Sequence, residues 1–186
     1  MPASSVSYPR LPDADERRDN AAFTAMMWAL SRPGKVQSLA EPGALALALA
    51  LCDRETRVWT EDDAFALRIA ETGSRIVKPQ DAQQAFFTAL DNDTALADFV
   101  RLPTGSALYP DDGASAFAPA RLGEGTRLSL TGPGVDGVVN LRIAGLHPGI
   151  WAARARACRY PAGVELFLIC GAGLIGLPRS TMIEVL

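Results

Sequence analysis

The stretch Val164-Glu165-Leu166-Phe167-Leu168-Ile169-Cys170-Gly171-Ala172-Gly173-Leu174-Ile175-Gly176 decides the fold of this 186-residue chain. Its first seven residues are apolar except for the glutamate, and they predict a buried strand. The glycines that follow fit the pattern G-x-G-x-x-G, which in a dinucleotide-binding fold opens a helix that leads to a second parallel strand. Pro178 interrupts that helix two residues after the last glycine, and the sequence given runs only to Leu186. We therefore interpret the glycines as a turn between two strands, and we predict a last strand from Met182 to Val185.

Length and composition predict one globular domain that spans residues 1–186. The apolar fraction is 48% and the charged fraction 21%, which are ordinary values for a domain of this class. Residues 1–12 contain three prolines and predict an extended N-terminal arm. The net charge of −3 argues against nucleic acid as a partner. The longest apolar run, Ala44 to Cys52, is about half of the ~18 residues that a membrane helix needs, so no membrane partner is expected.

The cysteines predict a cytoplasmic protein. Cys52, Cys158 and Cys170 are odd in number, widely spaced and without a metal-knuckle or C-x-x-C pattern. Such cysteines are typical of reduced thiols. The segment from Met1 to Leu11 lacks the charged-then-apolar pattern of a signal peptide.

Periodicity predicts an α/β fold: a three-layer sandwich with a mixed sheet. Helical spacing places Phe23, Met26, Met27 and Leu30 on one apolar face of the first helix. Helices alternate with short strands in the first half, and strands dominate the second half. We expect helices over residues 13–31, 44–52, 61–71 (capped by Thr60), 94–100 and 148–157, and strands over residues 35–39, 57–59, 115–121, 127–130, 138–144, 164–170 and 182–185. The segment 84–90 could form a helix or a strand; we favour a strand, with Phe86 and Phe87 on opposite faces.

The chain lacks residues that several classes of enzyme need for catalysis. The only histidine, His147, would have to serve any Ser-His-Asp or Cys-His site, but a lone histidine in a turn is more typical of an ordinary polar residue. Metal sites based on histidine fail for the same reason. The only lysines, Lys35 and Lys78, lie beside no phosphate-binding glycine loop, so a pyridoxal phosphate site is not expected. We therefore predict no catalytic residues, no cofactor and no metal.

Charged residues in turns remain as candidate contacts for an anion or a partner protein. Arg54 lies between Asp53 and Glu55, and Arg57 follows three residues after it. The two arginines could hold an anionic group or form local salt bridges that fix a corner. Arg32 could contact a phosphate or cap the first helix, and Tyr109 lies in a loop that could bind a ligand or simply turn the chain. The full set of candidate contacts is Arg32, Asp53, Arg54, Glu55, Arg57, Tyr109, Arg179, Ser180 and Thr181.

Read together, these turns resemble the PhnH subunit family of the bacterial carbon–phosphorus lyase system. The resemblance covers the chain from about residue 20 to its end, and it depends on the order and spacing of six motifs. They are Ser31-Arg32-Pro33-Gly34, Leu51-Cys52-Asp53-Arg54-Glu55-Thr56-Arg57-Val58-Trp59, the segment 105–111 with Tyr109-Pro110, Leu128-Ser129-Leu130-Thr131-Gly132-Pro133-Gly134, Gly163-Val164-Glu165-Leu166, and Leu177-Pro178-Arg179-Ser180-Thr181.

The resemblance implies a fold like the large domain of the pyridoxal-phosphate-dependent transferases, without the cofactor site. It also implies a multisubunit assembly with the G, I and J subunits that converts alkylphosphonates through a ribose-triphosphate-linked intermediate. In that system a radical iron–sulfur subunit cleaves the carbon–phosphorus bond. The present chain lacks the three-cysteine cluster motif that such a subunit requires.

The expected function is therefore that of an accessory, non-catalytic subunit of the carbon–phosphorus lyase core complex in phosphonate metabolism. The alternative is a small-ligand module that binds a nucleotide or a phosphonate in a vestigial cofactor pocket. We also expect the isolated chain to form a homodimer through an edge strand or the apolar surface near Met26, Met27 and Trp28.

Overall fold

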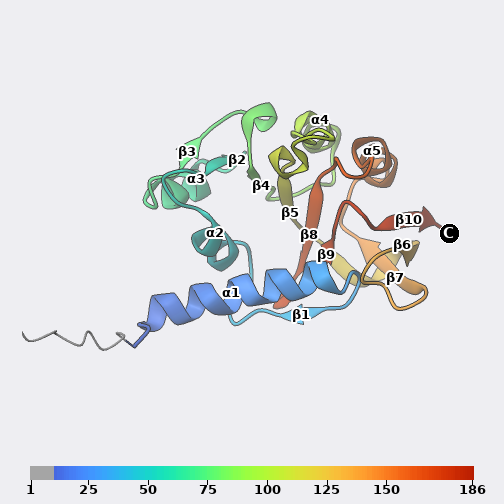
Figure 1. The fold of residues 1–186 in the computed structure, drawn as a ribbon, viewed down its shortest axis with the longest axis horizontal. Helices are drawn as coiled ribbons and strands as arrows, with labels where there is room; N and C mark the ends of the chain where they lie inside the picture. Colours follow the sequence, from blue (N-terminus) through green and yellow to red (C-terminus); the bar gives the residue numbers. More distant parts are fainter. Residues whose placement is uncertain (1–10) are drawn as a thin grey trace, which may run out of the picture.

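Five α-helices and ten β-strands are present in residues 11–186, the part of the chain that the computed structural model describes (Figure 1). The strands form a large sheet and a small one. The fold is α/β, as the sequence predicts. Most of the predicted N-terminal arm lies outside the described residues.

The large sheet is mixed and has seven strands in the order β1-β9-β8-β5-β4-β2-β3. Its five strands from β8 to β3 are parallel, while β9 runs antiparallel to both β8 and β1. The strands are β1 (Gln37–Ser38), β2 (Arg57–Thr60), β3 (Arg75–Ile76), β4 (Gln84–Phe86), β5 (Ser115–Pro119), β8 (Glu165–Cys170) and β9 (Gly173–Leu177).

The small sheet is antiparallel, with the order β10-β6-β7. It consists of β6 (Arg121–Thr131), β7 (Val139–Ala144) and β10 (Met182–Val185). The predicted last strand is confirmed, but it joins this second sheet, which the sequence analysis did not predict. The reason is that β10 pairs with β6, for example Ile183 with Leu130, across a large separation in sequence.

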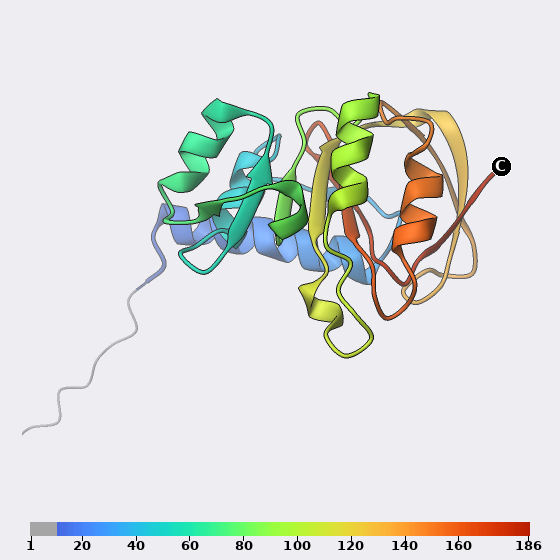
Figure 2. The same cartoon turned by 90° about the horizontal axis from the view of Figure 1, so that it is seen from above.

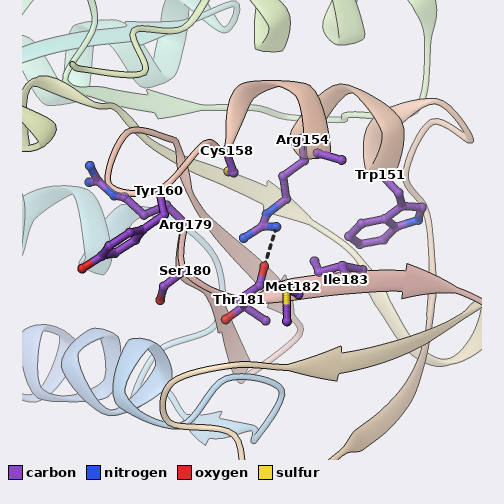
Figure 3. A pocket seen from close by; sticks show the side chains of 10 residues that line it. Trp151, Arg154, Cys158, Tyr160, Arg179, Ser180, Thr181, Met182 and Ile183 are labelled. Carbon is purple, nitrogen blue, oxygen red and sulfur yellow. Dashed lines mark hydrogen bonds between the residues drawn. The ribbon is translucent and has the colours of Figure 1, made fainter. Parts of the chain in front are cut away.

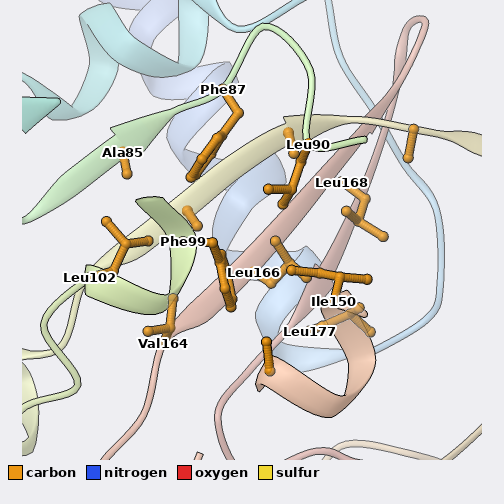
Figure 4. Packing of buried hydrophobic residues seen from close by; sticks show 14 of the residues in the cluster. Ala85, Phe87, Leu90, Phe99, Leu102, Ile150, Val164, Leu166, Leu168 and Leu177 are labelled. Carbon is orange, nitrogen blue, oxygen red and sulfur yellow. The ribbon is translucent and has the colours of Figure 1, made fainter. Parts of the chain in front are cut away.

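Helices cover both faces of the large sheet (Figure 2). Apolar residues of α1 (Ala14–Ser31), α2 (Leu45–Leu51) and α3 (Asp63–Ala70) share one buried cluster with one face of the sheet. Residues of α4 (Asp93–Arg101), α5 (Ile150–Ala157) and the small sheet share a second cluster with the other face. Figure 4 shows Phe99 of α4 and Ile150 of α5 in this cluster. Phe86 belongs to the first cluster and Phe87 to the second, so the prediction that they point to opposite faces is confirmed.

Three phenylalanines stack across the middle of the large sheet. Phe86, Phe117 and Phe167 are paired in register on β4, β5 and β8. Their ring centroids lie 4.6 Å and 4.7 Å apart, and all three side chains are buried. The stack therefore links the three central parallel strands under α1, α2 and α3.

The prediction that the glycines form a turn after the buried strand is confirmed for Gly171 only. The other glycines belong to β9, a strand that was not predicted from the sequence and that forms a β-hairpin with β8. Gly171 has φ +63°, whereas Gly173 and Gly176 belong to β9. A Cβ atom on Gly176 would lie 2.6 Å from the carbonyl carbon of Ala29. The third glycine therefore lets β9 lie directly against α1.

Because of this close approach, the apolar face predicted for α1 is partly wrong. The helix buries Ala22, Ala25, Met26 and Ala29, and leaves Phe23 and Met27 about half exposed. Small alanines are needed where the strand meets the helix, so the bulky side chains point away. The cap of α3 is also corrected, because Asp62, not Thr60, accepts hydrogen bonds from the Ala64 and Phe65 amides.

In the part of the chain that the structure describes, no helix combines the length and the apolar character needed to cross a lipid bilayer.

Replacing Phe117 by alanine should lower the free energy of unfolding by about 3–5 kcal/mol, because it removes the middle ring of the stack and leaves a cavity. Denaturant unfolding measures the change. Leu67→Ala is the control, since Leu67 is 72% exposed and should change the stability by less than about 0.5 kcal/mol. A loss below about 1 kcal/mol for Phe117→Ala would contradict the role assigned to the stack.

Candidate functional site

Three of the loops singled out from the sequence meet at one edge of the large sheet, where the parallel strands begin. Gln84, Ser115 and Glu165 lie side by side in register at the starts of β4, β5 and β8. The turn 53–56, the turn 109–113 and the loop 177–181 surround this edge. The fold thus brings together motifs that are far apart in the sequence.

Arg179 joins these loops. Its main-chain N–H donates to Oε2 of Glu165 at 2.7 Å, and its Nε donates to Oε1 of the same carboxylate. One terminal nitrogen of its guanidinium donates to the carbonyl oxygen of Pro110. Both charged side chains are largely buried. Arg179 therefore ties the last loop to β8 and to the turn 109–113.

A cavity of about 460 Å³ opens at this edge and is here called the amino-end cavity. Asp53, Glu55, Asp111 and Arg179 supply its charged lining. Because Arg179 is already paired with Glu165, the remaining charge is negative. This arrangement suits a cationic side chain of another protein better than a phosphate.

Asp53 organises the turn at the border of this cavity. Its Oδ1 accepts hydrogen bonds from the Glu55 and Thr56 amides and from the Thr56 hydroxyl, at 2.9, 3.2 and 2.8 Å. These hydrogen bonds lower the pKa of Asp53, and the bond from the Thr56 hydroxyl has the largest effect. Among the described residues, no ion pair forms within the segment 53–57. The corner is held by the aspartate turn and not by local salt bridges.

A second cavity, of about 330 Å³, lies on the other side of the Arg179 loop and is here called the Arg154 cavity (Figure 3). Arg154 enters it from α5, and Arg179, Ser180 and Thr181 line it from the loop before β10. The Arg154 side chain donates to the carbonyl oxygens of Thr181, Leu177 and Pro178, at 3.2, 3.1 and 2.6 Å. Burial lowers the pKa of Arg154.

The nine predicted contact residues do not form one site. Asp53, Glu55 and Arg179 line the amino-end cavity, and Ser180 and Thr181 line the Arg154 cavity together with Arg179. Tyr109 is exposed beside them. Its carbonyl oxygen accepts from the Ser106 amide, and its own amide donates to the Ser106 hydroxyl, so these two bonds close the turn.

The other three arginines lie outside both linings. Arg32 lies at the end of α1, with its guanidinium 4.4 Å from the centre of the Trp28 ring. Arg54 packs against Gly73 after α3, and Arg57 donates to the carbonyl oxygen of Asp81.

Sequence reasoning missed Arg154 and the carboxylate that pairs with Arg179. Arg154 could have been found from helical spacing, since it follows Ile150 and Trp151 at i+4 and i+3 and so belongs to the buried face of α5. Glu165 could have been found as the single charged residue in an otherwise apolar strand. A charge placed on a buried face requires a partner.

His147 makes contacts that hold neighbouring segments together. Its Nδ1 accepts from the Gly149 amide at 3.0 Å, and its Nε2 lies 3.1 Å from Oδ1 of Asp93. The histidine thus connects the starts of α5 and α4. Within residues 11–186, no three histidine, cysteine, aspartate or glutamate side chains gather as they would around a metal ion.

The opposite edge of the large sheet, where ligands of open α/β folds bind, holds a cavity of about 250 Å³. Phe65, Phe86 and Phe87 give it an apolar wall, and Thr60, Asp62 and Thr88 supply its polar groups. Among the described residues that line it there is neither a lysine nor an arginine. These residues do not fit pyridoxal phosphate, which needs a lysine for the Schiff base.

The fold and its two loop cavities define an α/β protein in which Asp53, Arg154 and Arg179 bond to loop atoms beside the cavities. Comparison with known proteins gives the family: the model of the bacterial phosphonate metabolism protein PhnH matches residues 13–184. The chain therefore belongs to the PhnH family.

Two curated relatives support this membership. A putative C-P lyase subunit protein HtxG of Stutzerimonas stutzeri is 33% identical over 171 residues, which cover 90% of this chain and 87% of the relative. The alpha-D-ribose 1-methylphosphonate 5-triphosphate synthase subunit PhnH of Rhizobium meliloti (strain 1021) is 28% identical over 182 residues, with 88% and 89% covered.

Replacing Glu165 by alanine should destabilise the protein by about 1–3 kcal/mol, because it leaves the largely buried Arg179 without its carboxylate. Arg179→Met should cost a similar amount. In denaturant unfolding, the double variant should lose clearly less than the sum of the two single variants. Strict additivity would show that the pair does not join the loops.

The thiol of Cys52 should resist alkylation at pH 9. Burial, followed by the charge of Asp53, raises the pKa of Cys52 to about 12, so the folded protein keeps the unreactive protonated form. The unfolded thiol ionises first as the pH rises, so this contribution to stability should be lost between about pH 9 and pH 12.

Iodoacetamide labelling followed by peptide mass spectrometry tests this for native and urea-unfolded protein. Cys158, which is less buried, serves as the internal comparison. Equal labelling rates at Cys52 in the two states would contradict the prediction.

Proposed function

We propose that this chain is an accessory, non-catalytic subunit of a carbon–phosphorus lyase assembly that acts on alkylphosphonates. The match of the PhnH family model over residues 13–184 carries the proposal. The printed names of the two relatives, a C-P lyase subunit and a triphosphate synthase subunit, support it. On this proposal the chain supports the formation of the ribose-triphosphate-linked phosphonate, and the G, I and J subunits are its partners.

The arrangement of charged residues favours a role through contacts over catalysis by the chain alone. The cations and acids at the amino-end edge mostly bond to one another or to main-chain atoms. A catalytic group needs to face a space where substrate can react. His147 bonds instead to neighbouring structural groups.

The exposed surface of α1 is the best candidate for a protein contact. Phe23, Met27 and Trp28 are 48%, 49% and 47% exposed; together with Arg32, which stacks on Trp28, they are here called the α1 surface. Exposed aromatic residues, methionine and arginine are typical of interface cores. We propose that this surface contacts another subunit in the assembly and a second copy in the isolated protein.

Three further features are proposed. The fold is like the large domain of the pyridoxal-phosphate-dependent transferases, which the seven-stranded mixed sheet with helices on both faces supports. The chain is one domain, as a single cooperative unfolding transition would support. It works in the cytoplasm, with which the three free thiols agree.

The alternative function, a module that binds a nucleotide or a phosphonate, has support from one observation. The guanidinium of Arg154 is buried beside a cavity and has no carboxylate in salt-bridge contact among the described residues.

Co-expression of the tagged chain with the G, I and J subunits tests the main proposal. Stoichiometric recovery of the partners is the expected result, and failure to recover partners that fold by themselves would contradict it. Met27→Asp should reduce recovery at least tenfold, because it places a charge in the contact. Leu67→Asp is the control, since it makes the same kind of change on an exposed part of α3 and should leave recovery unchanged.

A further inference from the structure

The buried cation of Arg154 has no counter-charge in direct contact. Its side chain is only 3% exposed, and the described residues offer it three carbonyl oxygens but no carboxylate within salt-bridge distance. Carbonyl dipoles solvate a cation without neutralising it. Burying a charge in this way is costly unless an opposite charge comes close.

Two buried polar atoms beside the same cavity are also without partners. Nε of Arg154 has no acceptor, and Oγ1 of Thr181, whose residue is 3% exposed, forms no hydrogen bond among the described residues. Both residues line the Arg154 cavity. Nearly all buried polar groups in native proteins form hydrogen bonds. These two unpaired atoms therefore indicate a missing hydrogen-bond partner.

The rest of the lining fits an anion with a small apolar substituent. No aspartate or glutamate is among the lining residues, while Ser180, Thr181 and Tyr160 bring hydroxyl groups. Trp151, Met182 and Ile183 form an apolar side. In Figure 3 the guanidinium of Arg154 points from α5 towards the loop of Ser180 and Thr181. A volume of about 330 Å³ has room for a phosphonyl or phosphoryl group and a short substituent.

Arg179 belongs to the same lining but contributes little net charge. Its guanidinium is paired with Glu165 and with the carbonyl of Pro110. The positive potential in the cavity therefore comes from Arg154, and the pair beyond it fixes the shape of the loop. A helix that presents an arginine to a loop of hydroxyl groups is a suitable cradle for a tetrahedral oxyanion.

From these observations we propose that the Arg154 cavity binds a tetrahedral oxyanion, the phosphonyl or phosphoryl group of a small ligand, with Arg154 as its main cation. Bound there, the anion neutralises the buried guanidinium and accepts hydrogen bonds from the hydroxyl groups of the loop. The loop also leads into β10, so a bound anion stabilises the contact between α5 and the small sheet.

The test is titration of the isolated full-length chain with methylphosphonate, followed by calorimetry and phosphorus NMR. Inorganic phosphate, sulfate and acetate are titrated in parallel. Saturable binding of methylphosphonate or phosphate, with acetate at least tenfold weaker, is the expected result. Tighter binding of methylphosphonate than of phosphate would identify the ligand's anionic group as phosphonyl. Tighter binding of phosphate would identify it as phosphoryl. No saturable binding of either at 10 millimolar, or acetate bound equally well, overturns the proposal.

Position 155 offers a variant that leaves the fold intact. Ala155 lies on α5, is exposed and lines the cavity, so Ala155→Glu places a carboxylate beside the anion and should weaken binding at least tenfold. Ala155→Gln has nearly the same size without the charge and should bind within about threefold of the natural protein. Equal binding by the glutamate and glutamine variants would place the anion elsewhere and overturn the proposal.

Arg154→Met should abolish binding, and Arg154→Lys should restore part of it. If the methionine variant fails to fold, the position 155 pair still decides the matter. The proposal deepens the alternative function, small-ligand binding, and rests on it. It is tested separately from the accessory-subunit role, because anion binding is measured without partner subunits and co-purification without the anion.

Discussion

The stack of Phe86, Phe117 and Phe167 is the contact on which the rest of the structure depends. It holds β4, β5 and β8 in one register, and this register places Gln84, Ser115 and Glu165 side by side at the starts of the strands. A slip of one residue would turn Glu165 away from the last loop, because successive side chains point to opposite faces. The position of Arg179, and with it the border between the two loop cavities, follows from the packing of three rings.

The polar groups are distributed unevenly between the two edges of the large sheet. Open α/β sheets bind ligands at the carboxyl ends of their parallel strands, but here that edge has an apolar cavity without basic residues among its described lining. The charged loops gather at the amino ends instead, where they mostly bond to one another. This distribution agrees with a subunit whose charged edge shapes loops and contacts. It also leaves Arg154, beyond the edge, as a buried cation without a direct counter-charge.

Arg154 joins α5 to the segment that connects the large and the small sheet. Its hydrogen bonds go to the carbonyl oxygens of Leu177, Pro178 and Thr181, which lie between the end of β9 and the start of β10. A side chain in this position serves structure through its carbonyl contacts and ligand binding through its charge. The two roles are compatible, because the three carbonyl bonds leave Nε without an acceptor.

The sequence by itself determined the α/β class, the helices and most of the strands, the turn at Gly171, the opposite directions of Phe86 and Phe87, and the family resemblance that the comparisons confirm. These features depend on local periodicity, on turn chemistry and on the order of motifs along the chain. Only the tertiary structure decided that β10 joins a second sheet, that α1 buries alanines against Gly176, and that Glu165 and Arg154 face the last loop. Each of these depends on contacts between segments far apart in the chain, and no local pattern specifies which segments will meet.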